Sequence, residues 1–207
     1  ILEMVTLTLE KMARGGIYDQ LGGGFSRYSV DDRWEVPHFE KMLYDNAQLV
    51  RLYLHAYQVT KKPLFRRVVR ETIEYVTREM THRKGGFYSA SDADSEGVEG
   101  KFFVWSVDEI DAALTEEDAE LAKLFWGVTE QGNFEDSNTL TVPVSLEEFV
   151  AGSGRDPGEL ISDITRVRGI LFDQRSKRVP PSTDDKILTS WNALMLSALA
   201  EAGAVLD

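Results

Sequence analysis

Apolar residues recur every three or four positions over several long stretches of the chain. This spacing puts them on one face of an α-helix, where they pack against a core. It predicts helices up to about Ala13, over 43–57, over 63–80 and over 158–175, and a final helix near Ser190. The chain is therefore predicted to be mainly α.

Capping residues mark the ends of several of these helices. Ser or Thr followed three residues later by an acid occurs at 106–109, 115–118 and 145–148, a pattern that satisfies free N–H groups in a first helical turn. Asp156 before Pro157 marks a fourth start. Gly15 and Gly16 are expected to end the first helix in a left-handed cap.

Two features suggest how the helices are connected. Aromatic segments at 87–89 and 102–105 flank an acidic loop over 92–100, which predicts a β-hairpin. The segment 45–49, Asp-Asn-Ala-Gln-Leu, resembles 191–195, Trp-Asn-Ala-Leu-Met. Helical hairpins repeated around a ring produce such a repeat, so we expect part of an α/α toroid with small β-hairpin insertions.

Composition limits the function. Lys and Arg number 23 against 35 Asp and Glu, a net charge of -12, so nucleic-acid and membrane-surface partners are not expected. Without cysteine there is no disulfide, thiolate zinc site or thiol nucleophile, and we expect a cytoplasmic location. No cofactor or metal is expected. The 207 residues are interpreted as a fragment of one domain, cut from a longer protein at both ends.

The densest group of chemically active residues lies between Gly22 and Asn46. Histidine beside a carboxylate can transfer protons near neutral pH, glycines admit a ligand close to the backbone, and aromatic rings stack on sugars. The alternative is that the glycines shape a turn, the aromatics fill the ring, and Arg33 pairs with an aspartate. The candidates here are Arg27, Tyr28, Trp34, His38, Glu40, Asp45 and Asn46.

The acidic loop begins like a calcium-binding loop, with oxygen-bearing side chains at alternate positions of 92–97. Its twelfth position is Phe103 instead of the required glutamate. Three interpretations stay open: an irregular cation site, a hairpin tip held by Asp and Ser turns, or a source of catalytic carboxylates from Asp92, Asp94 or Glu99.

A second polar cluster precedes the final helix and contains Lys186, Trp191 and Asn192. In a toroid the N-termini of the inner helices point to one side, so this cluster and 38–46 are expected to line one funnel. Ordinary N-capping and a buried tryptophan are the alternative. Neither His55 nor His82 is assigned to a site.

Three strings of residues carry a family resemblance: 19–28 (DQLGGGFSRY), 37–47 (PHFEKMLYDNA) and 92–97 (DADSEG). With them the chain resembles the spermatogenesis-associated thioredoxin-domain proteins, also called the YyaL-like family. That resemblance implies a thioredoxin-like domain followed by an (α/α)6 toroid similar to six-hairpin glycosidases and N-acylglucosamine 2-epimerases. The thioredoxin-like domain is absent from this chain, so no redox activity is transferred to it.

The expected function is a carbohydrate-active enzyme, either a sugar epimerase or isomerase or a glycoside hydrolase, with a carbohydrate ligand in the funnel. The alternative is a non-catalytic module that partners the thioredoxin-like domain of the full-length chain, which predicts a funnel lined by mutually paired charges. Catalytic roles are expected for His38, Glu40 and Asp45. Substrate binding is expected for Arg27, Tyr28, Trp34, Asn46, Asp92, Asp94, Lys186, Trp191 and Asn192.

Overall fold

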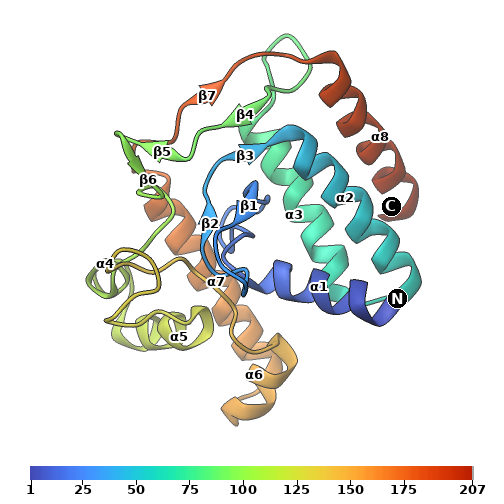
Figure 1. The fold of residues 1–207 in the computed structure, drawn as a ribbon. Coiled ribbons are helices and arrows are strands. Elements are labelled where there is room, and N and C mark those ends of the chain that lie inside the picture. The colour runs from blue at the N-terminus through green and yellow to red at the C-terminus, as the bar shows by residue number, and fades with distance from the viewer. Residues whose placement is uncertain (207) are drawn as a thin grey trace.

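The computed structural model describes residues 1–206 and is mainly helical (Figure 1). The helices are α1 (Leu2–Arg14), α2 (Leu43–Thr60), α3 (Pro63–Glu79), α4 (Val107–Ala113), α5 (Glu116–Trp126), α6 (Leu146–Ser153), α7 (Pro157–Arg175) and α8 (Thr189–Leu206). Short strands join them: β1 (Tyr28–Ser29), β2 (Pro37–His38), β3 (Lys41–Met42), β4 (Ala90–Ser91), β5 (Asp94–Ser95), β6 (Val98–Glu99) and β7 (Thr183–Asp184). The predicted helices are confirmed.

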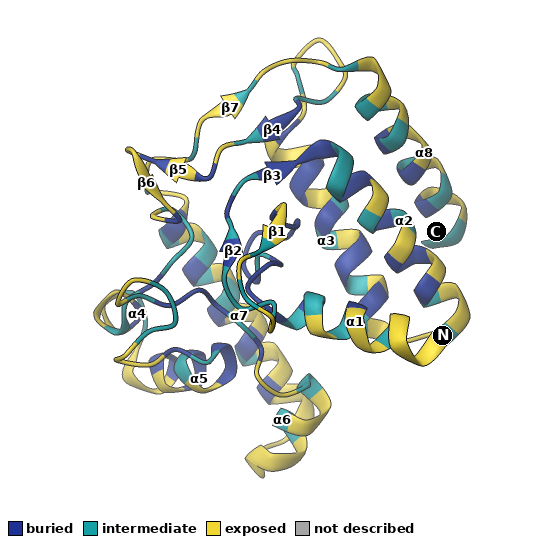
Figure 2. Cartoon of the chain, in the orientation of Figure 1, coloured by how far each residue is buried: buried dark blue, intermediate teal, exposed yellow. Residues whose placement is uncertain are grey.

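The larger body of the molecule, called the first body below, consists of the helices α1, α2, α3 and α8. The helices α2 and α8 lie side by side and start at the same end, next to β3, β4 and β7 (Figure 1). The buried faces of α2 and α3 enclose a core with Leu43, Val50 and Phe65 at its centre (Figure 2). From the sequence, the polar clusters at the starts of these two helices are expected to lie on one side of the molecule. The parallel arrangement of α2 and α8 agrees with that expectation.

A second, smaller body consists of α4 to α7. Trp105, Trp126 and Leu171 are buried in its core. The serine capping boxes at 106–109 and 145–148 form with both reciprocal hydrogen bonds, as predicted. At 115–118 only the threonine oxygen accepts a bond. The Asp118 carboxylate binds Arg166 instead of the cap N–H.

The predicted hairpin between 87–89 and 102–105 is wrong. Instead β4 pairs with both β3 and β7 in a three-stranded antiparallel sheet. The hairpin lies inside the acidic loop, where β5 pairs with β6 around Glu96 and Gly97, both at positive φ. Phe103 lies in a turn, and its ring stacks on Phe39 at 5.6 Å. The aromatic run therefore serves packing and not strand pairing.

The predicted left-handed cap at Gly15 is also wrong, since its φ is −76°. The two glycines are needed for a close backbone approach instead. A Cβ on Gly15 would lie 2.2 Å from the Trp34 carbonyl oxygen, and one on Gly16 would lie 2.0 Å from the Glu35 oxygen. The loop 27–36 can pack on the end of α1 only because these positions carry no side chain.

The internal repeat is present in three dimensions. The side chain of Asn46 accepts from the Phe25 N–H at 2.8 Å and donates to the Phe25 and Met42 carbonyls. Asn192 forms the same three bonds with Phe87 and with Leu188. Each phenylalanine follows a Gly-Gly pair at positive φ. Each unit thus consists of a helix, a Gly-Gly-Phe loop and a second helix whose asparagine holds that loop.

The two bodies meet through ion pairs that are largely buried. Asp19 from the loop after α1 binds Arg175 of α7 at 2.7 Å and Lys41 of β3 at 3.0 Å. Arg168 of α7 binds Glu71 of α3 and donates to the Leu21 carbonyl. These contacts fix α7 against the first body. Within residues 1–206, no helix is both long and apolar enough to cross a bilayer.

Candidate functional site

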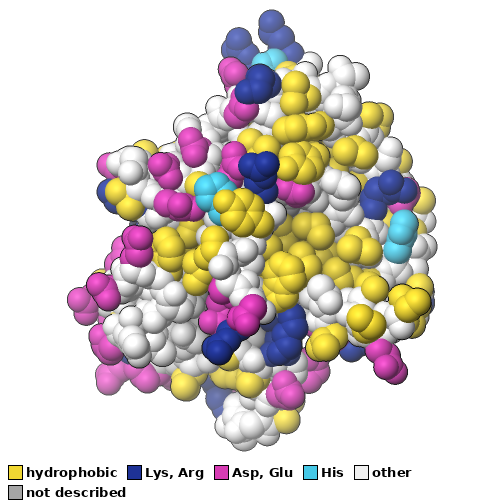
Figure 3. Space-filling model, in the orientation of Figure 1, with side chains coloured by type: hydrophobic (Ala, Val, Ile, Leu, Met, Phe, Trp, Pro, Cys, Tyr) yellow, Lys and Arg dark blue, Asp and Glu magenta, His cyan; other side chains and the backbone are white. Residues whose placement is uncertain are grey.

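The candidate residues of the first cluster meet over β1, β2 and the start of α2. Tyr28 lies directly opposite His38 in the β1–β2 pair, and their rings stack at 5.0 Å. The His38 side chain is 28% exposed, so it is held firmly yet open to solvent. Side chains of histidine, cations and carboxylates gather over these strands, beside a hollow with hydrophobic walls (Figure 3).

A carboxylate lies on each side of the His38 ring. Its Nδ1 lies 2.6 Å from Glu99 Oε1, and its Nε2 lies 3.9 Å from Glu40 Oε2. An ionised carboxylate only accepts hydrogen bonds, so Nδ1 donates to Glu99. In the neutral ring this leaves the lone pair on Nε2, the arrangement of an oriented general base.

Glu40 is also bound to Arg27 at 3.0 Å. Hydrogen bonds with Glu40 and then Tyr44 raise the pKa of Arg27. The guanidinium therefore stays charged and fixes the Glu40 carboxylate beside His38. The cluster of Arg27, Glu40, His38 and Glu99 is hereafter the His38 cluster.

Asp45 follows in the first turn of α2 and differs from the other carboxylates. Its Oδ2 atom is buried and has no hydrogen-bond partner. Burial raises its pKa, the charge of Arg27 opposes the rise, and the charge of Glu40 adds to it. Asp45 can therefore carry a proton at a higher pH than an exposed aspartate.

Two residues expected to bind substrate have other roles in the structure. Asn46 is fully buried, and both Asn46 and Asn192 use their amide groups to hold the Gly-Gly-Phe loops. We therefore correct the assignment of Asn46 from ligand contact to loop anchoring, because its side chain is out of reach of a ligand. Ligand contact by the half-buried Asn192 stays a prediction. Trp34 and Trp191 pack partly buried against the first core, and Trp191 also meets Tyr44 edge to face at 4.7 Å.

The second cluster lies next to the first. The contact between Tyr44 and Trp191 joins the starts of α2 and α8, and β4 lies between β3 and β7. Lys186 is exposed and ion-paired with Asp184. The two patches therefore share one side of the molecule.

The acidic loop contributes Glu99 to the His38 cluster and little else. Asp92 accepts from the N–H groups of Ala93 and Asp94 and from the Ser182 hydroxyl. Its pKa is lowered by the Asp94 N–H and the Ser182 hydroxyl, and the nearby charge of His38 adds to this effect. Asp94 is exposed. No group of three or more His, Asp or Glu side chains within residues 1–206 is arranged to hold a metal ion.

Comparison with known proteins places the chain among its relatives. No family model matches it. Spermatogenesis-associated protein 20 of Homo sapiens is 40% identical over 229 aligned positions, which cover 99% of this chain, and the protein of that name from Rattus norvegicus is 39% identical. The chain is a homologue of part of spermatogenesis-associated protein 20. The resemblance inferred from the three strings is confirmed.

The relatives are much longer than this chain. It spans 29% of the human spermatogenesis-associated protein 20 and 31% of an uncharacterized Caenorhabditis elegans protein that is 35% identical to it. Among solved structures, a crystal structure of D-mannose isomerase aligns with 98% of this chain and 46% of its own, at 13% identity and a TM-score of 0.37. A similarity of that size carries no argument about function.

Sequence reasoning missed the buried network of Asp19, Lys41 and Arg175. Lys41 is only 1% exposed although lysine is among the residues least often buried. Lys41 binds Asp19, which lies 22 residues away in the loop after α1. Arg175 at the end of α7 binds the same carboxylate across 156 residues of the chain. No local pattern signals such a contact. By contrast, Glu99 is one of the carboxylates of the acidic loop that the sequence offers as an acid or base, because glycoside hydrolysis needs two carboxylates. Its contact with His38, 61 residues away in sequence, is not visible there.

Proposed function

We propose that this chain forms part of an α/α toroid whose funnel binds a carbohydrate, and that His38 transfers a proton there as in a sugar epimerase or isomerase. The observation that carries the proposal is the 2.6 Å contact between His38 Nδ1 and Glu99. A carboxylate in that position fixes the tautomer and stabilises the imidazolium that forms when Nε2 takes a proton. Proton transfer by a positioned histidine contributes roughly 10²–10⁴ to a rate.

The proposed reaction begins with a sugar in its open-chain carbonyl form. His38 Nε2 removes the proton from the carbon beside the carbonyl, and the electron pair of that C–H bond moves to form an enediolate. Burial raises the pKa of Asp45, and in its protonated form Asp45 donates its proton to the developing oxygen anion. For an isomer, the proton returns to the carbon that carried the carbonyl, and the hydroxyl proton of the neighbouring carbon passes to the Asp45 carboxylate as the new carbonyl forms. For an epimer, the proton returns to the opposite face of the same carbon, and the first oxygen gives its proton back to Asp45 as the original carbonyl re-forms.

The charge pairing disfavours the glycoside hydrolase alternative. That chemistry needs one protonated carboxylic acid and a second ionised carboxylate free to act on the sugar or a water. Asp45, whose pKa is raised by burial, is the candidate for the first role. Glu40 and Glu99 are held by Arg27 and His38, so neither is free for the second role.

The same ion pairs favour the second candidate, a non-catalytic binding module. Charges that are mutually satisfied need no ligand, and Arg27 with Glu40 and Lys186 with Asp184 are such pairs. In this proposal the toroid positions the thioredoxin-like domain expected in the full-length chain. Asp45 Oδ2, buried without a partner, is the feature it leaves unexplained.

Deuterium exchange separates the two candidates. The full-length protein, and the variants His38→Ala and His55→Ala, are incubated in D2O with a panel of aldoses, ketoses and N-acylated amino sugars and followed by NMR. Enolisation puts deuterium on the carbon beside the carbonyl even where the net conversion is small. We expect His38→Ala to lose roughly 10² or more of that exchange.

His55 is the matched control, because it is an exposed histidine that also pairs with a glutamate. It lies towards the end of α2, where its partner is Glu201 of α8. Its variant should exchange at the wild-type rate. If neither the wild-type protein nor His38→Ala exchanges the proton of any sugar faster than buffer alone, the proposal that this chain is an enzyme is wrong. If this chain nevertheless binds the separately prepared thioredoxin-like domain, that result supports the second candidate, the non-catalytic module.

A further inference from the structure

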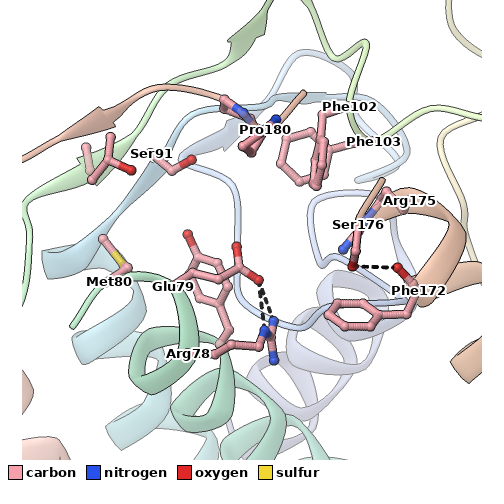
Figure 4. A pocket seen from close by; sticks show the side chains of 14 residues that line it. Arg78, Glu79, Met80, Ser91, Phe102, Phe103, Phe172, Arg175, Ser176 and Pro180 are labelled. Atoms are coloured by element: carbon pink, nitrogen blue, oxygen red, sulfur yellow. Dashed lines mark hydrogen bonds and ion pairs between the residues drawn. The ribbon is translucent and has the colours of Figure 1, made fainter. Parts of the chain in front are cut away.

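A separate cavity of 420 Å³ lies where the two bodies meet. The ends of α3 and α7, the strands β4 and β7, and the turn at 102–103 surround it (Figure 4). None of its lining residues belongs to the His38 cluster or to the expected substrate-binding residues. Its volume is in the range of small-molecule sites, roughly 300–1,000 Å³.

Aromatic rings form much of the wall. Tyr75, Phe102, Phe103 and Phe172 all line the cavity. The guanidinium of Arg175 lies 5.2 Å from the ring of Phe102, 5.5 Å from that of Phe103 and 5.7 Å from that of Phe172. A flat apolar molecule can therefore pack against several ring faces and edges at once.

The charges behind this wall do not balance. Arg175 and Lys41 are 3% and 2% exposed in their side chains, and both bind the single carboxylate of Asp19. At the rim, Arg78 pairs with Glu79 at 2.5 Å, and both are partly exposed (Figure 4). Two buried cations facing one buried anion leave an excess positive charge beside the cavity, in a chain whose net charge is -12.

Two buried donors near the cavity lack an acceptor. The Tyr75 hydroxyl and the Arg175 Nε–H are buried and have no hydrogen-bond partner, and both residues line the cavity. Tyr75 is 1% exposed. Because nearly all buried polar groups in folded proteins are hydrogen-bonded, such donors indicate a missing acceptor.

We infer that this cavity is a binding site for a small organic anion with a flat apolar body, of the aryl carboxylate class. The carboxylate supplies the acceptor for the unpartnered donors and compensates the excess positive charge. The aryl body lies in the cavity against the aromatic residues that line it. This site is independent of the chemistry proposed at His38.

The test uses 2-naphthoate as the probe, with 2-naphthamide as its uncharged counterpart, in calorimetric titrations of the purified protein. We expect saturable, one-to-one binding of 2-naphthoate and affinity for 2-naphthamide lower by about tenfold, the size of a charge-assisted hydrogen bond. Equal binding of the two probes, or no binding of 2-naphthoate at millimolar concentration, overturns the inference.

Two neighbouring charges give effects of opposite sign. Arg78→Gln removes a cation from the rim and should weaken 2-naphthoate binding roughly fivefold, while Glu79→Gln removes the rim carboxylate and should strengthen it roughly two- to fivefold. Arg66→Gln is the control, because Arg66 is exposed on α3 away from the cavity. Equal effects of the Arg66 and Arg78 variants indicate non-specific attraction and contradict the site.

Filling the cavity provides a test that does not depend on charge. Ser176 lines the cavity at the end of α7 and is exposed, so Ser176→Phe should block the space without opening the core. Circular dichroism checks that this variant folds. A folded Ser176→Phe protein that binds 2-naphthoate as tightly as wild type places the probe elsewhere and overturns the inference.

Discussion

Asp19 is a buried carboxylate that pairs with two buried cations, Arg175 and Lys41. Burial by itself would raise the pKa of its carboxyl, but the charges of Arg175 and Lys41 outweigh this effect and hold the pKa well below its usual range. The N–H of Gly22 adds a hydrogen bond. Because Arg175 and Lys41 are nearly inaccessible to water, loss of this one carboxylate leaves two buried cations without their counter-ion.

We predict that Asp19→Asn lowers the free energy of unfolding by about 3–5 kcal/mol at pH 7. A carboxyl whose pKa is depressed by folding stabilises the protein above its unfolded pKa and stops doing so as the pH falls. The difference between wild type and variant should thus be constant at neutral pH and narrow as the pH falls below the ordinary value of 3.8. Urea denaturation at a series of pH values measures it.

The control for this prediction is Asp173→Asn, which removes an exposed carboxylate from α7. That variant should track the wild type at every pH. A difference between wild type and Asp19→Asn that persists unchanged at pH 3 would show that the aspartate acts through its shape and not its charge.

At the scale of elements, each Gly-Gly-Phe loop is fastened to the start of a helix by one asparagine. The two junctions make the same hydrogen bonds in different surroundings. Asn46 is fully buried, whereas Asn192 is half-buried and water can reach the groups it releases. Comparing the two sites therefore separates two free-energy costs: the loss of the asparagine hydrogen bonds, and the burial of backbone groups that neither protein nor water can satisfy.

We predict that Asn46→Ala costs about 2–4 kcal/mol of unfolding free energy and Asn192→Ala about 1 kcal/mol, since an unsatisfied buried group costs more than one that water can satisfy. Urea unfolding of the two variants gives both numbers. If the two costs are equal, the loops are held by packing of the phenylalanines and the asparagines are secondary.

The sequence predicted these elements unevenly, for physical reasons. Helices were predictable because apolar spacing and caps are local, as at 106–109 and 145–148. The repeat was only half visible, because 21 residues separate Phe25 from Asn46 and 105 separate Phe87 from Asn192. The aromatic segment 102–105 is predicted to be a strand, because periodicity does not distinguish rings that pair in a sheet from rings that cover a buried arginine.

The candidate site was predictable in its position but less so in its roles. The sequence placed His38, Glu40 and Arg27 in one cluster, and the structure brings them together with Glu99. An asparagine at a helix start looks the same in sequence whether it faces a ligand or a loop. Asn46 was therefore assigned to substrate although its contacts are with Phe25.

At the scale of the whole molecule, two hydrophobic cores are linked by polar contacts. The first core lies among α1, α2, α3 and α8, and the second among α4, α5 and α7. Leu21 from the loop after α1 is buried in the second core, and Arg168 of α7 donates to its carbonyl while pairing with Glu71. Cooperative unfolding of the two bodies therefore depends on a few side chains.

The four tryptophans report on the two cores separately. Trp34 and Trp191 pack against the first core, while Trp105 and Trp126 are buried in the second. Replacing either pair by phenylalanine leaves a protein whose fluorescence follows one core alone. In the otherwise wild-type chain we expect both reporters to give the same urea midpoint, because the linking ion pairs are intact.

Arg168→Met should separate the two midpoints. The change removes the partner of Glu71 and the donor to Leu21, at a cost of about 1–3 kcal/mol, and nearly all of that cost falls on the contact between the bodies. The second body should unfold first, because its helix α6 has no buried residue and contributes little to the core. Arg66→Met, on the exposed face of α3, should leave the midpoints together. Coincident midpoints in Arg168→Met, lowered by the same amount, would mean that the remaining contacts, the Asp19–Arg175 ion pair and the burial of Leu21, are enough to make the molecule unfold as one unit.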